Sequence, residues 1–238
     1  MKDFVNHSGG AIGSDSAWDE IGKEFGMINN KHYYYGQKTP KGNTLISEDE
    51  YEEGKEKVLL ANKVLKRKPE MYMNLLARNW VQVKNSEAIF AIGEISNNLV
   101  KGGTGWAVQM AIDAGKPVYV FDQNMNKWFK WDDRIFSETY IPTLTKHFAG
   151  IGTRKITDVG NDAIREVYSK TEYYLMMNST KEKSLSIPFG KYKDQEISVI
   201  AKNDIQYLLW ILQNASNLPK DTIMAIEREI IKTKLKKK

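Results

Sequence analysis

Three glycine-rich segments contain the residue types that could bind a phosphate. They span residues 8–15, 102–105 and 150–154, and each follows an apolar run and precedes a stretch with helical spacing. Glycine lets the backbone approach a phosphate closely, and free N–H groups at a helix start attract an anion. One such turn would mean little, because every α/β protein needs tight turns. Three together predict a ligand that carries phosphate.

The candidate ligand-binding residues come from these segments and from one helix between them. Hydroxyl and guanidinium groups would donate to phosphate oxygens. Asp15 either positions a ribose hydroxyl or caps the helix that it starts, and Trp106 either stacks on a base or packs in the core. The predicted set is Ser8, Gly9, Gly10, Ser14, Asp15, Asn79, Gly102, Gly103, Thr104, Gly105, Trp106, Gly152, Thr153 and Arg154.

The standard nucleotide-binding and metal-binding signatures are absent. The sequence contains neither Gly-x-x-x-x-Gly-Lys-Ser/Thr nor Gly-x-Gly-x-x-Gly followed by a suitably spaced acidic residue, which argues against a P-loop NTPase and a dinucleotide fingerprint. There is no cysteine, and His7, His32 and His147 lack the spacing of metal ligands. We therefore expect no metal ion and no cofactor.

The net charge does not identify a nucleic-acid partner. The formal charge is +5 and the pI is near 9.0, but residues 1–178 and 179–231 each hold equal numbers of basic and acidic residues. The excess is therefore the five lysines after residue 231, and such a terminal run is usually a solvated tail. Binding of DNA through this tail is an alternative that we do not favour, and it would show steep salt dependence.

Alternating apolar strands and amphipathic helices predict an α/β fold with a Rossmann-like, mostly parallel sheet flanked by helices. The clearest βαβ unit consists of a strand at 88–92, a helix opened by Gly102–Gly105, and a strand at 117–121. In a parallel sheet the glycine-rich turns would lie together at the carboxyl edge, where ligands bind open α/β folds.

Other elements follow from local signals. Ser47 and Glu50 form a capping box at the start of a helix that ends near Arg67. We expect a second helix from about Glu70 to Asn85, an edge strand at Trp128–Trp131, and a helix that ends near Met177.

We expect the chain to divide into a Rossmann-like domain at 1–178 that holds the three glycine-rich segments, a polar linker at 179–185, and a small α+β accessory domain at 186–238 that ends in the basic tail. In the accessory domain we expect a strand at 197–200 and helices at about 204–214 and 220–233. A domain of this size is near the lower limit for independent folding.

Three motifs in order resemble the SLOG superfamily of Rossmann-like proteins, and the pattern is most similar to the molybdenum-carrier family. The motifs are Ser8-Gly9-Gly10-Ala11-x-Gly13-Ser14-Asp15-Ser16-Ala17, Arg78-Asn79 with Asn85-Ser86-Glu87-Ala88, and Gly102-Gly103-Thr104 continuing to Ala114-Gly115-Lys116-Pro117-Val118. Residues 186–231 resemble a small C-terminal domain of exodeoxyribonuclease-X-like proteins, through Pro188-Phe189-Gly190-Lys191-Tyr192, the segment around Ile197, and Tyr207-Leu208-Leu209-Trp210.

The resemblance implies binding of nucleotides. SLOG relatives include phosphoribohydrolases and sensors of ADP-ribose-like or cyclic nucleotide signals in anti-phage defence. The hydrolase motif ends in a catalytic Glu, where this chain has Gln109, and a carboxamide cannot accept the proton. We therefore expect binding without turnover, as a sensor or sequestering protein in conflict between phage and bacteria. The alternative is a phosphoribohydrolase-like enzyme that cleaves an N-glycosidic bond, with Asp15 or Glu94 as the carboxylate.

The remaining expectations concern location and assembly. The chain enters a polar, glycine-rich stretch after its first six residues, and no apolar run approaches the ~20 residues that span a bilayer. We expect a cytoplasmic protein with no membrane partner, a nucleotide-derived small molecule as its ligand, and a homo-oligomeric state.

Overall fold

The computed structural model describes residues 1–36, 42–179, 185–215 and 218–235. Contacts divide the chain into two compact units, Met1–Thr171 and Glu172–Lys238, with the division inside a long helix. Most of the expected linker, residues 180–184, lies outside the described residues.

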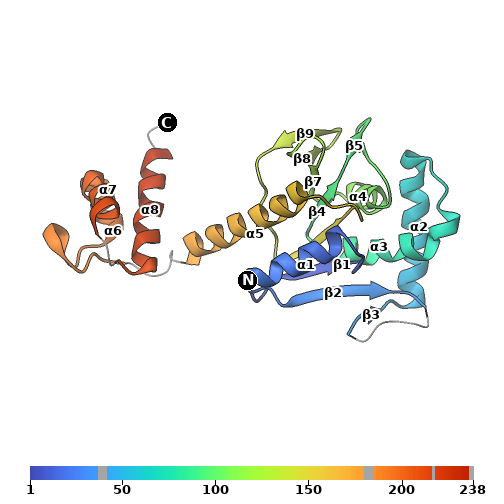
Figure 1. Ribbon diagram of the computed structural model, residues 1–238, viewed down its shortest axis with the longest axis horizontal. Helices are drawn as coiled ribbons and strands as arrows, with labels where there is room; N and C mark the ends of the chain where they lie inside the picture. Colours follow the sequence, from blue (N-terminus) through green and yellow to red (C-terminus); the bar gives the residue numbers. More distant parts are fainter. Residues whose placement is uncertain (37–41, 180–184, 216–217, 236–238) are drawn as a thin grey trace. The chain divides into compact units, whose positions relative to one another are not determined.

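The larger unit contains an eight-stranded sheet (Figure 1) with the order β3-β2-β1-β10-β4-β7-β8-β9. The strands from β3 to β7 in this order are parallel, and β8 and β9 extend the sheet in antiparallel fashion. The strands are β1 (Val5–Ser8), β2 (Asn29–Tyr34), β3 (Thr44–Leu45), β4 (Ala88–Gly93), β7 (Val118–Asp122), β8 (Lys127–Asp132), β9 (Ile135–Thr139) and β10 (His147–Gly152), with a separate hairpin of β5 (Ile95–Ser96) and β6 (Leu99–Val100).

Helices cover both faces of the sheet, so the predicted α/β class is confirmed. One face packs on α3 (Met73–Asn85) and α4 (Thr104–Asp113), and α2 (Glu48–Leu65) packs on these two helices. The three helices share an apolar core with β4, β7 and β10. The other face packs on α1 (Ser14–Glu24) and α5 (Asp158–Ser179). A short 3-10 turn, η1 (Glu70–Tyr72), precedes α3.

Trp18 of α1 occupies the centre of the second face. Its ring packs edge-on against Phe148 and Tyr168, with centroids 6.0 and 5.7 Å away. Gly150 of β10 makes this possible, because a Cβ atom there would lie 2.6 Å from Trp18 Cγ. Gly150 therefore serves helix packing within a strand, where the sequence indicated a turn.

Local signals predicted the helices well. The capping box at the start of α2 is present: Ser47 Oγ accepts from Glu50 N at 3.2 Å, and Glu50 Oε2 accepts from Ser47 N at 2.9 Å. The predicted edge strand at 128–131 is β8, but its edge position is wrong. A turn at Asp133, whose φ is +49°, leads into β9, which forms the edge.

The smaller unit contains α6 (Ile197–Asn203), α7 (Ile205–Asn214) and α8 (Lys220–Leu235), with a 3-10 turn η2 (Gly190–Tyr192). The expected strand at 197–200 is wrong, because these residues form α6. Ile197, Ile200 and Ala201 recur at helical spacing and are buried against α7 and α8. Extended pairing in the described part of this unit is limited to two isolated bridges, one of them between Ser186 and Glu196.

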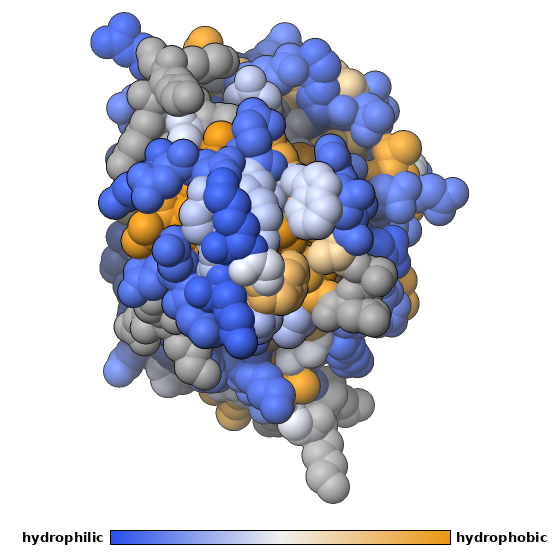
Figure 2. All heavy atoms as spheres, turned by 90° about the vertical axis from the view of Figure 1, so that its left-hand side faces the viewer, coloured by the Kyte–Doolittle hydropathy of each residue, from blue (hydrophilic) through white to orange (hydrophobic). Residues whose placement is uncertain are grey.

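The surface in Figure 2 is mainly hydrophilic, with hydrophobic side chains gathered in small groups. Two aromatic side chains of the smaller unit are among the exposed ones, Phe189 and Trp210. Among the described residues, no helix has both the length and the apolar character needed to cross a membrane.

Candidate functional site

Two of the three glycine-rich loops lie against each other at the carboxyl edge of the sheet. Ser14, the first residue of α1, donates from its N–H and its hydroxyl to Thr153 O, at 3.0 and 2.8 Å. Gly13 has a φ of +109°, and a Cβ atom there would lie 2.6 Å from Arg154 Cα. The loop after β1 and the loop after β10 are therefore one packed structure.

This packing uses donors that were expected to bind an anion. Ser14 N donates to Thr153 O, and Ser16 N donates to Ala11 O at 3.2 Å. The start of α1 therefore offers these two N–H groups to protein carbonyls, and they do not support the expected binding of a phosphate at this helix start.

The other predicted residues of these two loops mainly support the loops themselves. Ser8 is fully buried, and its hydroxyl accepts from Gly10 N at 3.1 Å. Thr153 Oγ1 accepts from Lys155 N, and a Cβ atom at Gly152 would lie 2.5 Å from Ile92 O. Arg154 is exposed and available to a ligand.

The loop before α4 is open toward solvent. Gly102 and Gly103 are exposed, and a Cβ atom at either would meet nothing within 4 Å. Arg67, after the end of α2, donates to the carbonyls of Gly102 and Val100 at 2.8 and 3.0 Å. Gly105 packs so closely that a Cβ atom would lie 2.1 Å from Val100 O. Gly102, Gly103 and the partly exposed Thr104 are thus the residues here that could contact a ligand.

Two residues of α4 are directed into the protein. Trp106 is 5% exposed and belongs to the apolar core, which favours packing over base stacking. Gln109 is buried, and its Nε2 donates to Asp113 Oδ1 at 2.9 Å on the same helix. The residue at the position of the hydrolase Glu therefore makes its hydrogen bond within α4.

A group of polar side chains converges on Gly9, directly after β1. A Cβ atom at Gly9 would lie 2.9 Å from Asp15 Oδ2, 3.2 Å from Gln82 Nε2 and 3.3 Å from Arg78 Nη2. Asn79 Oδ1 lies 3.4 Å from Gln82 Nε2. We call Gly9, Asp15, Arg78, Asn79 and Gln82 the Gly9 cluster. It joins the first loop to α3, and only glycine leaves room for it.

Arg78 has a donor that nothing in the described chain accepts. Its Nη1 donates to Tyr33 O at 3.1 Å, and its guanidinium lies over the ring of Tyr34, 5.2 Å from the centroid. Its Nε is buried and has no hydrogen-bond partner among the described residues. A buried unpaired donor costs about 1–3 kcal/mol. An acceptor bound beside the cluster would recover this free energy.

Asp15 is a buried carboxyl next to this guanidinium. It is 8% exposed, and Ala11 N donates to its Oδ2 at 3.3 Å. Burial raises the pKa of Asp15 to about 6, against the opposing effects of the Ala11 hydrogen bond and the Arg78 charge. A carboxyl that titrates near neutral pH can accept a ligand hydroxyl and has the properties of a general acid or base.

A carboxylate–imidazole pair lies beside the cluster. Asp19, one turn after Asp15, accepts from Asn6 Nδ2 at 2.9 Å and lies 2.6 Å from His32 Nε2. The hydrogen bond to Asp19 raises the pKa of His32. A Cβ atom at Gly10 would lie 3.0 Å from the His32 ring, so the first loop lies directly on this pair.

Asp15 and Asn79 were predicted from the sequence as site residues, whereas Gln82, Asp19 and His32 were not, and Arg78 was named only as part of a motif. Helical spacing offered a signal. Asp15 and Asp19 are four residues apart on one helix, as are Arg78 and Gln82 on another, and such pairs share a helix face.

No group of three possible metal-ligating side chains occurs in the part of the chain that the structure describes. His7 Nδ1 lies 2.7 Å from the hydroxyl of Tyr33, and its Nε2 lies 3.1 Å from His147 Nδ1. Burial lowers the pKa of His7 to about 4. His7 therefore stays neutral and forms part of a polar contact between β1, β2 and β10.

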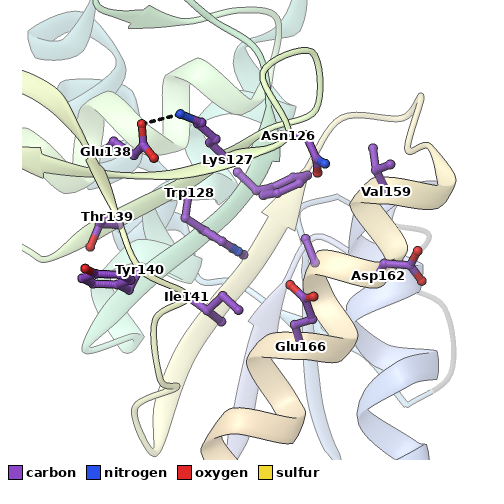
Figure 3. Close-up of a pocket in the computed structure, with 12 residues that line it drawn as sticks. Asn126, Lys127, Trp128, Glu138, Thr139, Tyr140, Ile141, Val159, Asp162 and Glu166 are labelled. Atoms are coloured by element: carbon purple, nitrogen blue, oxygen red, sulfur yellow. Dashed lines mark hydrogen bonds and ion pairs between the residues drawn. The ribbon is translucent and has the colours of Figure 1, made fainter.

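A cavity of about 470 Å³ lies elsewhere, between the antiparallel strands and α5 (Figure 3). It shares no lining residue with the Gly9 cluster.

Comparison of the chain with models of protein families, with curated proteins and with solved structures finds no match. The fold and the site by themselves define a class of protein. It is a Rossmann-like α/β protein with a buried polar cluster at the carboxyl edge of its sheet. The resemblance to SLOG proteins stays a prediction from the three motifs.

Proposed function

We propose that the Gly9 cluster binds a nucleotide-derived small molecule, ADP-ribose-like or a cyclic nucleotide, without turnover. The observation that carries this proposal is the buried Nε of Arg78, which lies beside the glycine-rich first loop and has no hydrogen-bond partner among the described residues. A guanidinium is planar and matches the oxygens of a phosphate or pyrophosphate. Asp15 would accept a ribose hydroxyl, and Arg154, at the neighbouring loop, would contact a second phosphate.

The cellular role in this proposal rests on the motifs that resemble SLOG proteins. A chain that binds such a signal and does not degrade it acts as a sensor or as a sequestering protein, in conflict between phage and bacteria. A cytoplasmic location and a homo-oligomeric state belong to the same proposal. Gln109 supports binding over hydrolysis, because its carboxamide cannot act as a general acid or base and its Nε2 donates to Asp113 Oδ1.

A second candidate function is cleavage of an N-glycosidic bond. One observation favours it: burial raises the pKa of Asp15 to about 6, so this carboxyl could exchange a proton with a substrate near neutral pH. In that reaction Asp15 would replace the Glu that is missing at position 109.

The proposal is tested with a panel of ADP-ribose, NAD, cyclic mononucleotides, cyclic dinucleotides and inorganic phosphate, screened by thermal shift and measured by calorimetry. Arg78→Met keeps most of the apolar stem and removes the donors. We expect it to weaken the best ligand at least about tenfold, as for a lost charged hydrogen bond. Arg165→Met is the matched control, because Arg165 forms an exposed ion pair with Glu24. Equal affinity of Arg78→Met and the unchanged protein would refute the assignment.

Turnover is tested on the same samples. After incubation the protein is denatured and the released molecule is identified by mass spectrometry. Recovery of intact ligand supports binding without turnover. A cleaved product that disappears in Asp15→Asn would instead support the hydrolase.

A further inference from the structure

The cavity in Figure 3 lies between the carboxyl ends of β7 and β9, the amino end of β8 and the first turns of α5. Its volume of about 470 Å³ falls within the range of small-molecule sites. All of its lining residues belong to the unit Met1–Thr171. None of the residues predicted to bind the nucleotide contributes to it, so it would form a separate site.

Aromatic side chains form one wall. Phe121 and Trp128 are almost fully buried, and their ring centroids lie 5.5 Å apart. Tyr140 is 91% exposed. Lys170 of α5 donates to the carbonyl of Ile141, which attaches the segment after β9 to α5. The cavity therefore combines two buried rings with one exposed ring.

The opposite wall is acidic. Asp162 and Glu166 lie four residues apart on α5 and both line the cavity, as does Glu138. Lys127, the one basic residue among those that line it, forms an ion pair with Glu138 at 2.7 Å. Asp162 forms an ion pair with Arg165 at 3.6 Å, and Arg165 does not line the cavity. For Glu166 we find no ion pair among the described residues. The charge of the wall is therefore negative.

One polar group facing the cavity has no hydrogen-bond partner in the part of the chain that the structure describes. The Nε1 of Trp128 is buried and unpaired among the described residues, and the side chain is only 3% exposed. Figure 3 shows the nitrogen of this indole turned toward the space between Ile141 and Glu166. Buried tryptophan N–H groups usually find an acceptor, so this one indicates a missing acceptor at the inner end of the cavity.

We propose that this cavity binds a small organic cation that also carries a hydrogen-bond acceptor, such as an ammonium alcohol. The positive group would be attracted by the carboxylate of Glu166 and by the faces of the aromatic rings. The apolar body would cover Phe121 and Trp128. The ligand's hydroxyl or carbonyl oxygen would accept from Trp128 Nε1, which a purely apolar ligand would leave unpaired. An anionic ligand could accept from this N–H, but the carboxylate of Glu166 would repel it.

Three probes separate the parts of this proposal. Choline has both the cation and the hydroxyl. Its neutral isostere, in which a tert-butyl group replaces trimethylammonium, keeps the shape and the hydroxyl. Tetramethylammonium keeps the charge and lacks the acceptor. Binding is followed in the full-length protein by NMR of the indole N–H signals, with the Trp128 signal assigned from Trp128→Phe.

We expect choline to shift the Trp128 signal saturably, and the neutral isostere and tetramethylammonium each to bind about tenfold more weakly, as for loss of a cation–π contact or a hydrogen bond. Glu166→Gln should weaken choline by a similar factor. Glu56→Gln is the matched control, because Glu56 is exposed on α2 and does not line the cavity.

Three results would overturn the proposal: no saturable shift at tens of millimolar choline, equal binding of the neutral isostere, or unchanged choline affinity in Glu166→Gln. Glu166 is exposed, so its substitution tests the site even if Trp128→Phe fails to fold. Arg78→Met should leave choline binding intact, which keeps this test independent of the nucleotide proposal.

Discussion

Replacement of Asp15 by Asn tests the electrostatics of the Gly9 cluster directly. The amide keeps the shape of the carboxyl and an oxygen that can accept from Ala11 N, and it cannot ionise. In the unchanged protein, burial raises the pKa of Asp15 from the ordinary 3.8 to about 6. The folded protein therefore holds this proton more tightly than the unfolded chain does.

The magnitude follows from linkage. A shift of about 2 pKa units at about 1.4 kcal/mol per unit corresponds to about 3 kcal/mol. Because the folded pKa is raised, this contribution to stability is fully present below the unfolded pKa and is lost as pH rises toward about 6. Between about pH 3.5 and pH 7, the free energy of unfolding of the unchanged protein should therefore fall by about 3 kcal/mol relative to that of Asp15→Asn. Any packing cost of the amide is the same at each pH, so it does not affect how the free-energy difference between the two proteins changes with pH.

The assay is urea unfolding over this pH range, followed by tryptophan fluorescence. All tryptophans except Trp210 belong to the larger unit, so the signal reports mainly on the unit that contains Asp15. The control is Asp133→Asn, in the exposed turn between β8 and β9. Its free energy of unfolding should depend on pH in the same way as that of the unchanged protein. A free-energy difference between Asp15→Asn and the unchanged protein that is constant with pH, or that changes in the opposite direction, would refute the reasoning.

Two further predictions concern packing. Gly105→Ala should destabilise the larger unit by about 2–3 kcal/mol, because the new methyl group would lie 2.1 Å from Val100 O, whereas Gly103→Ala meets nothing within 4 Å and should have little effect on thermal melting. Equal melting temperatures for the two variants would contradict this reading. Ile226→Ala removes a fully buried side chain of the smaller unit and should cost that unit about 3 kcal/mol in calorimetric unfolding. Nucleotide binding at the Gly9 cluster should stay unchanged, and weaker binding would show that the smaller unit contributes to the site.

The elements that sequence could predict are those whose signals are local. The run at 88–92 is a continuous apolar strand, and β4 is buried along its whole length. The capping box placed the start of α2. The run Ile197-Ser198-Val199-Ile200 misled because β-branched residues favour strands, while burial against α7 and α8 selects a helix. Burial depends on the tertiary neighbours, which the local run does not reveal.

The order of strands could not be predicted from local signals either. β10 is the last strand in the chain, yet it lies between β1 and β4 at the centre of the sheet. This insertion brings Thr153 against Ser14 and so uses the first N–H of α1. The Gly9 cluster depends on a second long-range contact, because Arg78 reaches Gly9 only when α3 packs beside β1. The sequence shows these residue types, but it does not show that they lie next to one another in the folded protein.

The position of a bound phosphate relative to Asp15 can be determined from the pH dependence of binding. Residues 1–178 carry no net charge, and two N–H groups at the start of α1 already donate to protein carbonyls. Arg78 is therefore the main group that attracts an anion at this cluster. If a pyrophosphate lies beside Arg78 and Asp15, ionisation of Asp15 repels it, and affinity should fall as pH rises through about 6. If a ribose hydroxyl donates to Asp15, ionisation strengthens that hydrogen bond and affinity should rise instead.

ADP-ribose suits this measurement because its pyrophosphate diester does not titrate in this range. Calorimetry with the unchanged protein and with Asp15→Asn separates the cases, because only the Asp15 contribution vanishes in the variant. The same profile in both proteins would place the ligand away from Asp15 and contradict the assignment of this carboxyl to the site.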